Sequence, residues 1–333
     1  MTVSGARGRY RVLLVGGAGY IGSHMVRLLV EAGHEVLVLD NLSTGHADAL
    51  RYGESVIGDM GDADLLDCIM SRAGFDCVMH FASYIEVGES VRDPGKYYHN
   101  NVTNTHCLIE AMVRNAVPAM VFSSTAAVYG EPRGVPIAED HPIAPINPYG
   151  RTKATVEGML ADYDGAHGLR SVALRYFNAA GAHPQGNLGE RHDPETHLIP
   201  LVLRAASGRR DSISLFGTDY PTADGSAIRD YIHVIDLCTA HLRALEYLME
   251  GGASARYNLG NGQGFSVREV IDAARTVTGR DIPVREEPRR PGDPAVLVAD
   301  STRARTEIGW QPEHTDLQTI IRDAWAFEQT LLA

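Results

Sequence analysis

The first half of the chain alternates short apolar runs with amphipathic helical stretches. An apolar run at 10–15 is followed by a helical pattern at 20–32 and a second apolar run at 35–39. Further apolar runs lie at 55–57, 77–81, 119–122 and 171–177, and the stretches between them include helical patterns at 94–115 and 149–167. Strands that alternate with helices predict an α/β fold with a doubly wound parallel sheet. Ligands of such sheets bind at the carboxyl ends of the strands.

The pattern changes after about residue 180. Loops rich in Gly, Pro, Asp and Asn separate short helical stretches at 237–250, 266–278 and 315–330. We expect residues 8–178 to form the first domain and residues 179–333 to form a smaller mixed α/β lobe that binds the substrate. Segments near 229–260 are expected to return to the first domain.

A glycine cluster, "VGGAGYIGSH", follows the first predicted strand and opens the first predicted helix. Gly16, Gly19 and Gly22 permit a tight turn and let backbone amides approach a pyrophosphate. Asp40 ends the second strand, 18 residues after Gly22. A carboxylate there accepts hydrogen bonds from a ribose diol and repels a 2′-phosphate. The pattern therefore predicts a Rossmann-type site that prefers NAD to NADP.

Further cofactor contacts are expected where the next strands end. Asp59 either accepts a hydrogen bond from the adenine amine or caps the next helix. Small residues in "HFAS" at 80–83 let the cofactor lie against the backbone, and His80 itself is expected to be a packed strand residue. The other cofactor contacts predicted in these segments are Tyr20, Ile21, Asn41, Met60, Phe81, Ala82, Ser83 and Ser123.

A tyrosine and a lysine lie one helical turn apart in "NPYGRTK". Lys153 is one of only two lysines in the chain, and Tyr149 precedes it by four residues, so the two share a helix face. An ammonium near a phenol favours the phenolate, and a phenolate beside NAD is a general base for a sugar hydroxyl. Reaching neutrality requires the phenol's pKa to fall by about 3 units, part of which the positive nicotinamide ring supplies. We therefore expect Tyr149 and Lys153 to be catalytic, and to contact the cofactor as well.

A third hydroxyl is expected at the end of the strand that runs over 119–122. Ser123, Ser124 and Thr125 follow that strand directly. We assign the proton-sharing role to Thr125, with Ser124 as the alternative.

Composition narrows the range of partners. The chain has 333 residues and a net charge of −12, which argues against a general nucleic-acid binder. Its four cysteines are scattered, so we expect no disulfide framework and a cytoplasmic location. We expect no signal peptide and no membrane association, because no stretch approaches the ~20 apolar residues needed to span a bilayer.

These motifs together resemble the extended short-chain dehydrogenase/reductase family and, within it, the UDP-glucose 4-epimerases (UDP-galactose 4-epimerases). The resemblance covers nearly the whole chain. "VGGAGYIGSH", "IEVGESV" and "APINPYGRTK" are similar to bacterial members that supply UDP-galactose for exopolysaccharide. The other motifs that carry it are "DNLSTGH", "YYHNNV", "SSTAAVYG", "LRYFNAAGAHP", "DYPTADG", "RDYIHVID", "YNLGNG" and "RRPGD".

The resemblance implies a reversible oxidation at C4 of a UDP-hexose, and thus UDP-glucose/UDP-galactose interconversion. Tyr149 takes the 4-hydroxyl proton, bound NAD takes the hydride, and the 4-keto sugar is reduced again on its other face. Asn100 and Tyr176 are implied at the cofactor, and the main chain of Ser214 and Phe216 at uracil. For the rest of the substrate, the resemblance implies that Arg229 and Arg290 bind the diphosphate and that Asp293 binds the uridine ribose. Thr125 is implied at the sugar. The other implied substrate contacts are Asn178, Leu198 and Tyr231.

Three departures from the family pattern concern the sugar. Ile85 stands where some relatives have a lysine, and His197 replaces a common sugar-contacting asparagine. Leu297 replaces a bulky tyrosine that limits the pocket beside the hexose C2 substituent in some relatives. N-acetylhexosamine, glucuronate and pentose nucleotides are therefore alternative substrates.

Other activities fit the sequence less well than epimerisation. Dehydratases of this fold place an Asp-Glu pair where this chain has Ala126 and Ala127, which disfavours elimination. A non-catalytic NAD-sensing protein does not need the tyrosine and the lysine. His183, His192 and His197 lie on a loop without helical spacing, so we predict no metal site. The amphipathic helices at 94–115 and 149–167 suggest a homodimer.

Overall fold

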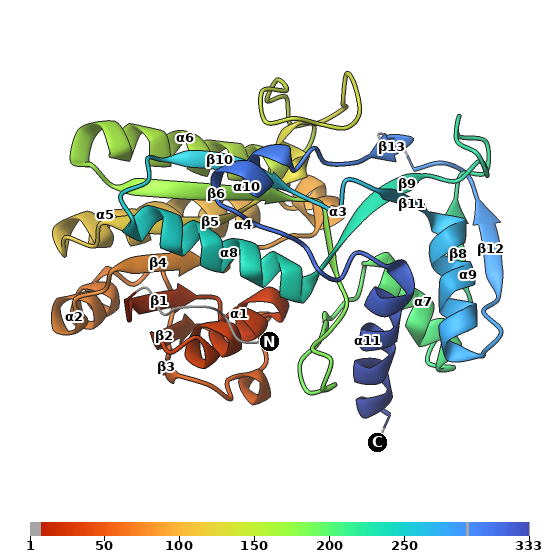
Figure 1. Ribbon diagram of the computed structural model, residues 1–333, viewed down its shortest axis with the longest axis horizontal. Helices are drawn as coiled ribbons and strands as arrows, with labels where there is room; N and C mark the ends of the chain where they lie inside the picture. The colour runs from red at the N-terminus through yellow and green to blue at the C-terminus, as the bar shows by residue number, and fades with distance from the viewer. Residues whose placement is uncertain (1–7, 291–292, 333) are drawn as a thin grey trace.

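The computed structural model describes residues 8–290 and 293–332. At its centre lies a seven-stranded sheet in the order β10-β6-β5-β4-β1-β2-β3, and every neighbouring pair in it is parallel (Figure 1). The direction of winding reverses between β1 and β4, which is where open α/β sheets bind ligands. The predicted doubly wound fold is confirmed. The strands are β1 Arg11–Val15, β2 Glu35–Asp40, β3 Glu54–Ile57, β4 Cys77–His80, β5 Ala119–Thr125, β6 Arg170–Tyr176 and β10 Ala255–Leu259.

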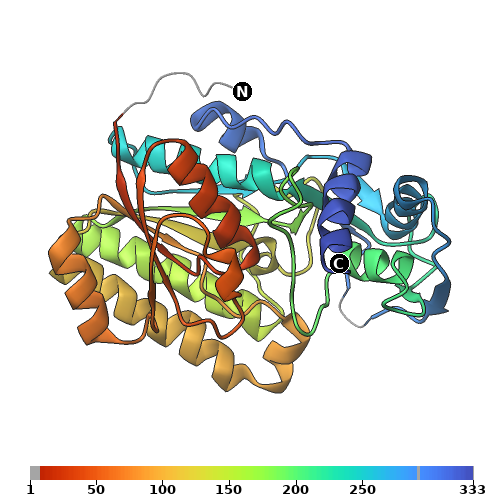
Figure 2. The same cartoon turned by 90° about the horizontal axis from the view of Figure 1, so that it is seen from below.

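Helices cover both faces of this sheet (Figures 1 and 2). Along β1, Val12 and Leu14 pack with one helical layer, and Leu13 and Val15 pack with the other. Because both faces are buried, the strand is a continuous apolar run rather than an alternating one. One layer contains α1 (Tyr20–Glu31) and α8 (Val234–Met249), and the other contains α2 (Ala63–Ala73), α5 (Thr105–Arg114) and α6 (Pro148–His167).

The predicted helical stretch at 94–115 is helical but not uniform. It consists of α4 (Pro94–Tyr98), a π-helical segment (His99–Asn104) and α5. A short helix, α3 (Val87–Arg92), precedes it. The π segment contains Asn100, which was predicted at the cofactor; such segments occur often at functional sites.

The second lobe lies at one end of the sheet (Figure 1). Its helices are α7 (Leu198–Ala206), α9 (Val267–Thr278) and α11 (Leu317–Thr330), which bury a separate apolar cluster that includes Val202, Ile271 and Ile320. Its strands are β7 (Asn178–Ala180), β8 (Ile213–Phe216), β9 (Ile228–His233), β11 (Gly264–Ser266), β12 (Val284–Glu287) and β13 (Val296–Leu297). The short helix α10 (Thr302–Glu307) packs beside β10.

The chain returns to the first sheet after entering the second lobe. Helix α8 packs on α1, and β10 adds a strand beside β6. The exact domain boundary after residue 178 stays a prediction. Among the described residues, no helix is both long and apolar enough to cross a membrane.

A single buried carboxylate ties together three segments of the second lobe. Asp230, on β9, is fully buried and accepts backbone hydrogen bonds from Asn261, Gly262 and Ala299, at 2.8, 3.1 and 3.1 Å. These donors lie in the β10–β11 connection and just after β13. The carboxylate therefore fixes the strand that carries Arg229, a residue predicted to contact the diphosphate.

We predict that Asp230→Ala lowers the free energy of unfolding by about 2 to 4 kcal/mol, because three backbone N–H groups, two of them on the buried residues Asn261 and Ala299, lose their acceptor. Urea unfolding followed by circular dichroism measures the change. The control is Asp281→Ala, which removes an exposed carboxylate from the same lobe. Equal stability of the two variants would contradict a structural role for the Asp230 carboxylate.

Candidate active site

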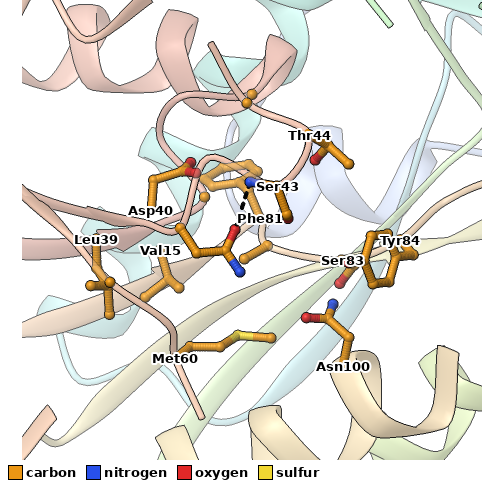
Figure 3. A pocket seen from close by; sticks show the side chains of 16 residues that line it. Val15, Leu39, Asp40, Ser43, Thr44, Met60, Phe81, Ser83, Tyr84 and Asn100 are labelled. Atoms are coloured by element: carbon orange, nitrogen blue, oxygen red, sulfur yellow. Dashed lines mark hydrogen bonds between the residues drawn. The ribbon is translucent and has the colours of Figure 1, made fainter. Parts of the chain in front are cut away.

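An open cleft lies at the carboxyl ends of β1, β2 and β4 (Figure 3). Figure 3 shows Asp40 toward one end, and Ser83, Tyr84 and Asn100 together at the other. Nine residues predicted to bind the cofactor line it, namely Gly16, Gly19, Asp40, Asn41, Met60, Phe81, Ala82, Ser83 and Asn100. The remaining lining residues, among them Ser43, Thr44 and Tyr84, were not predicted.

The glycine turn leaves no room for side chains. A Cβ on Gly16 would lie 2.5 Å from the backbone nitrogen of Ala82, and Gly16 has φ +90. A Cβ on Gly22 would lie 2.0 Å from the carbonyl oxygen of Gly16. Gly19 is the N-cap of α1 and has no side chain to cap the first N–H groups. The helix N-terminus thus offers its backbone donors to an anion.

Asp40 ends β2 beside this turn. Its Oδ2 accepts a hydrogen bond from the Ala18 backbone and its Oδ1 accepts one from the Leu42 backbone, each at 2.8 Å. A carboxylate has about four acceptor positions, so two remain for a ribose diol. The glycine turn and this carboxylate fit the dinucleotide that the sequence predicts.

Asp59 does not cap the following helix. The N-cap of α2 is Asp62, which accepts a hydrogen bond from the Leu65 backbone at 3.0 Å. Asp59 instead accepts hydrogen bonds from the Asn41 side chain at 2.6 Å and the Gly61 backbone at 2.7 Å. The capping alternative is therefore wrong, whereas the adenine contact stays a prediction.

His80 is a packed strand residue, as expected. It is fully buried, its Nε2 lies 2.8 Å from the Thr105 hydroxyl, and burial lowers its pKa to about 3.

Tyr149 and Lys153 lie in the first turns of α6. The N-cap of this helix, Asn147, accepts a hydrogen bond from the Gly150 backbone at 2.8 Å. Tyr149 is 9% exposed and Lys153 is 2% exposed. The Lys153 ammonium donates hydrogen bonds to the Ser83 hydroxyl and to the Ser123 carbonyl, both at 2.8 Å. Because Ser83 lines the cavity, the lysine joins the helix to the predicted cofactor site.

The lysine alone does not produce a phenolate. Burial raises the pKa of Tyr149 to about 12, although a hydrogen bond with Thr125 acts in the opposite direction. Burial also lowers the pKa of Lys153 to about 7, and Glu157 opposes this change. The expected lowering of the phenol's pKa by Lys153 is therefore not found in the protein alone. Removing both groups from water penalises both charged forms, which accounts for the direction of both shifts.

The three hydroxyls at the end of β5 have different partners, and Ser124 lies on the opposite face from Ser123 and Thr125. Ser123 contacts the phenol of Tyr176 through its hydroxyl. Ser124 donates a hydrogen bond to Glu157 at 2.6 Å. Thr125 accepts a hydrogen bond from the Ala127 backbone at 3.2 Å, and its hydroxyl lies near enough to Tyr149 to lower the pKa of the phenol. Because successive side chains of a strand point to opposite faces, the geometry supports Thr125 rather than Ser124 as the partner of the phenol.

The second lobe brings the predicted diphosphate and uridine residues together. The Arg229 guanidinium pairs with the Asp293 carboxylate, and the Arg290 guanidinium lies 3.9 Å over the Phe216 ring. The Ile213 N–H group donates to the carbonyl of Pro283, directly before β12, and the Gly217 N–H group donates to that of Glu287 at the end of β12. Since backbone groups alternate between the two edges of a strand, those of Ser214 and Phe216 face away from β12. Their N–H and C=O groups are therefore not used by β12, and their contact with uracil stays a prediction.

The remaining predicted substrate residues surround this region. Asn178 donates to the Asp230 carbonyl at 3.0 Å, and Tyr231 is buried on β9. Leu297 on β13 pairs in register with Arg229 and packs on an apolar cluster that includes Val128. Ala126 borders the same cluster, which places Leu297 close to the end of β5.

A histidine and glutamate cluster was not predicted from the sequence. Atoms of Glu190, His192, Glu195 and His197 that are capable of metal ligation lie within 4.8 Å of one another. Burial alone would lower the pKa of His192, but the two glutamates raise it to about 10. Likewise, burial would raise the pKa of Glu190, but the two imidazoles lower it to about 2. The cluster is therefore a network of ion pairs, which Arg204 joins through Glu195, although the same atoms are of the type that binds divalent metals.

The cluster fixes His197 at the N-terminus of α7, directly before Leu198. His183 lies apart from it, with Nδ1 3.1 Å from the Arg27 guanidinium. From the sequence, the three histidines are neighbours along the chain, but nothing in it indicates that two glutamates lie beside the imidazoles of His192 and His197.

Comparisons with known proteins agree with this geometry. The model of the NAD dependent epimerase/dehydratase family matches residues 12–260. The UDP-glucose 4-epimerase of Halalkalibacterium halodurans is 53% identical over 314 residues, which cover 94% of each chain. The structure is similar to that of UDP-glucose 4-epimerase from Brucella ovis in complex with NAD, with a TM-score of 0.93, 51% identity and coverage of 95% of this chain and 97% of that one.

A second solved structure is UDP-glucose 4-epimerase from Bifidobacterium longum in complex with NAD+ and UDP. It aligns with a TM-score of 0.91 at 36% identity and covers 96% of this chain and 98% of that one. The family match spans most of the chain, and relatives of about half identical sequence span nearly all of it. The chain therefore belongs to the NAD-dependent epimerase/dehydratase family.

Proposed function

We propose that this protein is an NAD-dependent UDP-hexose 4-epimerase that interconverts UDP-glucose and UDP-galactose through a transient 4-keto sugar. One observation carries the proposal: the buried Tyr149 phenol lies beside Thr125 at the end of β5, and Lys153 on the same helix bonds to Ser83, which lines the cavity predicted to hold NAD. The two similar solved structures, which hold NAD in one case and NAD+ with UDP in the other, support the choice of ligands.

NAD would be held by the glycine turn, by Asp40 and by the residues that line the cavity. When bound, it supplies the chemistry that takes hydride from C4 of the sugar and returns it. Asp40 selects the unphosphorylated ribose, because a 2′-phosphate would meet its buried carboxylate. The Lys153 ammonium is already fixed by Ser83 and Ser123 and is placed to bind ribose hydroxyls.

Tyr149 is proposed as the general base and acid at the 4-hydroxyl, and Thr125 as the hydroxyl that shares this proton. Only a cationic neighbour can offset the burial that holds the phenol's pKa near 12. Lys153 supplies one positive charge on the same helix face. The positive nicotinamide ring supplies a second one, which explains why the phenol is neutral in the protein alone.

The substrate is proposed to bind across the two lobes. Arg229 and Arg290 bind the diphosphate, Asp293 the uridine ribose, and the backbone of Ser214 and Phe216 the uracil. Asn178, His197, Leu198, Tyr231 and Leu297 complete the site on the sugar side. Tethering by the diphosphate leaves the sugar free to present either face, as inversion at C4 requires.

Elimination is disfavoured by the two alanines that come directly after Thr125. Ala126 and Ala127 form the turn Ala126–Val128, where an acid would be needed to protonate a leaving hydroxyl. The nearby Glu157 is buried and engaged by Ser124, Arg175 and Arg256. It cannot serve as that acid without breaking this network.

The proposal includes a homodimer, which would form through α5 and α6, because these two helices pack beside each other on one face of the sheet. It also includes a location and a pathway. The scattered cysteines, none of them in a disulfide among the described residues, support a cytoplasmic location. Supply of UDP-galactose for exopolysaccharide is suggested by the sequence motifs alone.

The direct test is a panel of UDP-sugars assayed without added NAD, with the products separated by chromatography. We expect UDP-glucose and UDP-galactose to interconvert, because the cofactor is regenerated in each turnover and stays bound. Reaction of only the UDP-xylose/UDP-arabinose pair or of a UDP-glucuronate pair would overturn the choice of sugar. No reaction of any UDP-sugar would overturn the enzymatic function and favour a non-catalytic NAD-binding protein.

Replacing the base tests the mechanism. Tyr149→Phe should lower kcat by about 100- to 10,000-fold, the usual contribution of a positioned general base. The NAD content of the purified protein should not change. The matched control is Tyr98→Phe, which alters a tyrosine that is 40% exposed. Normal turnover by Tyr149→Phe would exclude the phenol as the base.

Replacing Leu297 tests the size of the sugar pocket. Leu297→Tyr should lower the activity toward UDP-N-acetylglucosamine by at least about tenfold, because a bulky ring beside the C2 substituent excludes the acetamido group. Activity toward UDP-glucose should stay within about twofold. Leu297→Met, which conserves volume, is the control. Unchanged N-acetylhexosamine activity in the tyrosine variant would remove Leu297 as a gate.

A further inference from the structure

The catalytic lysine is followed, one helical turn later, by a buried glutamate. Glu157 lies on α6 four residues after Lys153 and is 5% exposed. Its Oε1 accepts hydrogen bonds from the Ser124 hydroxyl at 2.6 Å and from the Arg175 Nε at 2.9 Å. Its Oε2 pairs with Arg175 and lies 3.1 Å from the Arg256 Nε. No sequence pattern indicated a role for this glutamate or for the two arginines that bind it.

The network reaches the catalytic groups through β5. Ser124, which donates to Glu157, lies between Ser123 and Thr125. The Ser123 carbonyl accepts a hydrogen bond from Lys153, and Thr125 bonds with Tyr149. Glu157 therefore anchors the strand end that presents both catalytic contacts.

The charges around the Lys153 ammonium single out Glu157. From α6 itself, Tyr149 and Glu157 face this region. His80 on β4 and Tyr176 on β6 are both neutral there, because burial lowers the pKa of His80 and raises that of Tyr176. The cations Arg175 on β6 and Arg256 on β10 lie beyond Glu157 and bind to it. Glu157 lies four residues after Lys153 and so shares its face of α6, both side chains are buried, and the negative charge of Glu157 favours the ammonium.

We propose that Glu157 is a positioning residue that keeps Lys153 in its charged form, and that Arg256 sets how strongly it does so. Burial works against the ammonium and lowers the pKa of Lys153 to about 7, while Glu157 raises it. Arg175 is buried with Glu157 and fixes its position, whereas the side chain of Arg256 is 45% exposed. This inference rests on the proposed epimerase function, because only a charged Lys153 can stabilise the phenolate of Tyr149.

The two substitutions should act in opposite directions. Glu157→Gln keeps the shape and an acceptor for Ser124 but removes the negative charge, so Lys153 should lose its proton at lower pH. Arg256→Gln removes a cation that partly neutralises Glu157, so Lys153 should keep its proton to higher pH. A purely structural role for the network predicts no such opposition.

The chain permits a direct measurement, because Lys96 and Lys153 are its only lysines. Protein labelled with ¹³C at the lysine ε carbon gives two signals, which Lys96→Arg assigns. We expect the titration midpoint of Lys153 to fall by about one pH unit in Glu157→Gln and to rise by about half a unit in Arg256→Gln. The Lys96 midpoint, set by its pair with Glu89, should stay constant. Glu246→Gln, which removes a carboxylate paired with Arg243 on α8, is the charge-matched control.

The pH dependence of kcat should shift in the same directions as the Lys153 midpoint. Epimerisation needs the ammonium, so the alkaline limb of kcat should move to lower pH in Glu157→Gln and to higher pH in Arg256→Gln, with KM within about twofold.

A Lys153 midpoint that does not move in Glu157→Gln, or that moves in the same direction in both variants, overturns the proposal. Should Glu157→Gln not fold, an unshifted midpoint in Arg256→Gln overturns it. If the wild-type protein epimerises no UDP-sugar, the proposed function fails separately, since the Lys153 titration does not depend on turnover.

Discussion

The Lys153 ammonium and the Tyr149 phenol are both removed from water at the first turns of one helix, and this burial governs how the site works. In water the two groups would titrate near 10 and remain neutral phenol and charged ammonium at physiological pH. Burial penalises each charged form, so it raises the pKa of the phenol and lowers that of the lysine. The base can act only where other charges offset that penalty. The site thus couples its proton chemistry to the positive charge of the bound cofactor.

The fold provides the geometry for this coupling. Parallel strands end at one edge, so β4 and β5 present Ser83, Ser123 and Thr125 to the same helix. The glycine turn after β1 and the Asp40 carboxylate after β2 occupy the same edge of the sheet. The second lobe contributes through β9 and β13, which Asp230 holds in place from within. Catalytic groups and ligand contacts therefore come from segments far apart in sequence, and the sheet sets their spacing.

Much of this arrangement was predictable from the sequence, because it depends on local patterns. The parallel sheet follows from the alternation of apolar runs and helices, and the turn at Gly16 follows from glycine spacing. The prediction that Asp59 caps the following helix is wrong, because the helix begins three residues later and Asp62 caps it. The pairing of Glu157 with Arg175 and Arg256 joins one helix to two strands, so no periodicity reveals it. The cluster of Glu190 with His197 depends likewise on the path of a loop. The sign of the phenol's pKa shift depends on burial, which sequence spacing does not report.

Burial suppresses the Tyr149 phenolate, and the bound cofactor is expected to restore it. The most direct test of this coupling is the ultraviolet difference spectrum of wild-type protein minus Tyr149→Phe, titrated with and without NAD. The phenol should resist ionisation up to about pH 12 without NAD, as burial requires, and should ionise well below pH 10 with NAD bound. The same titration midpoint in both forms would contradict this coupling.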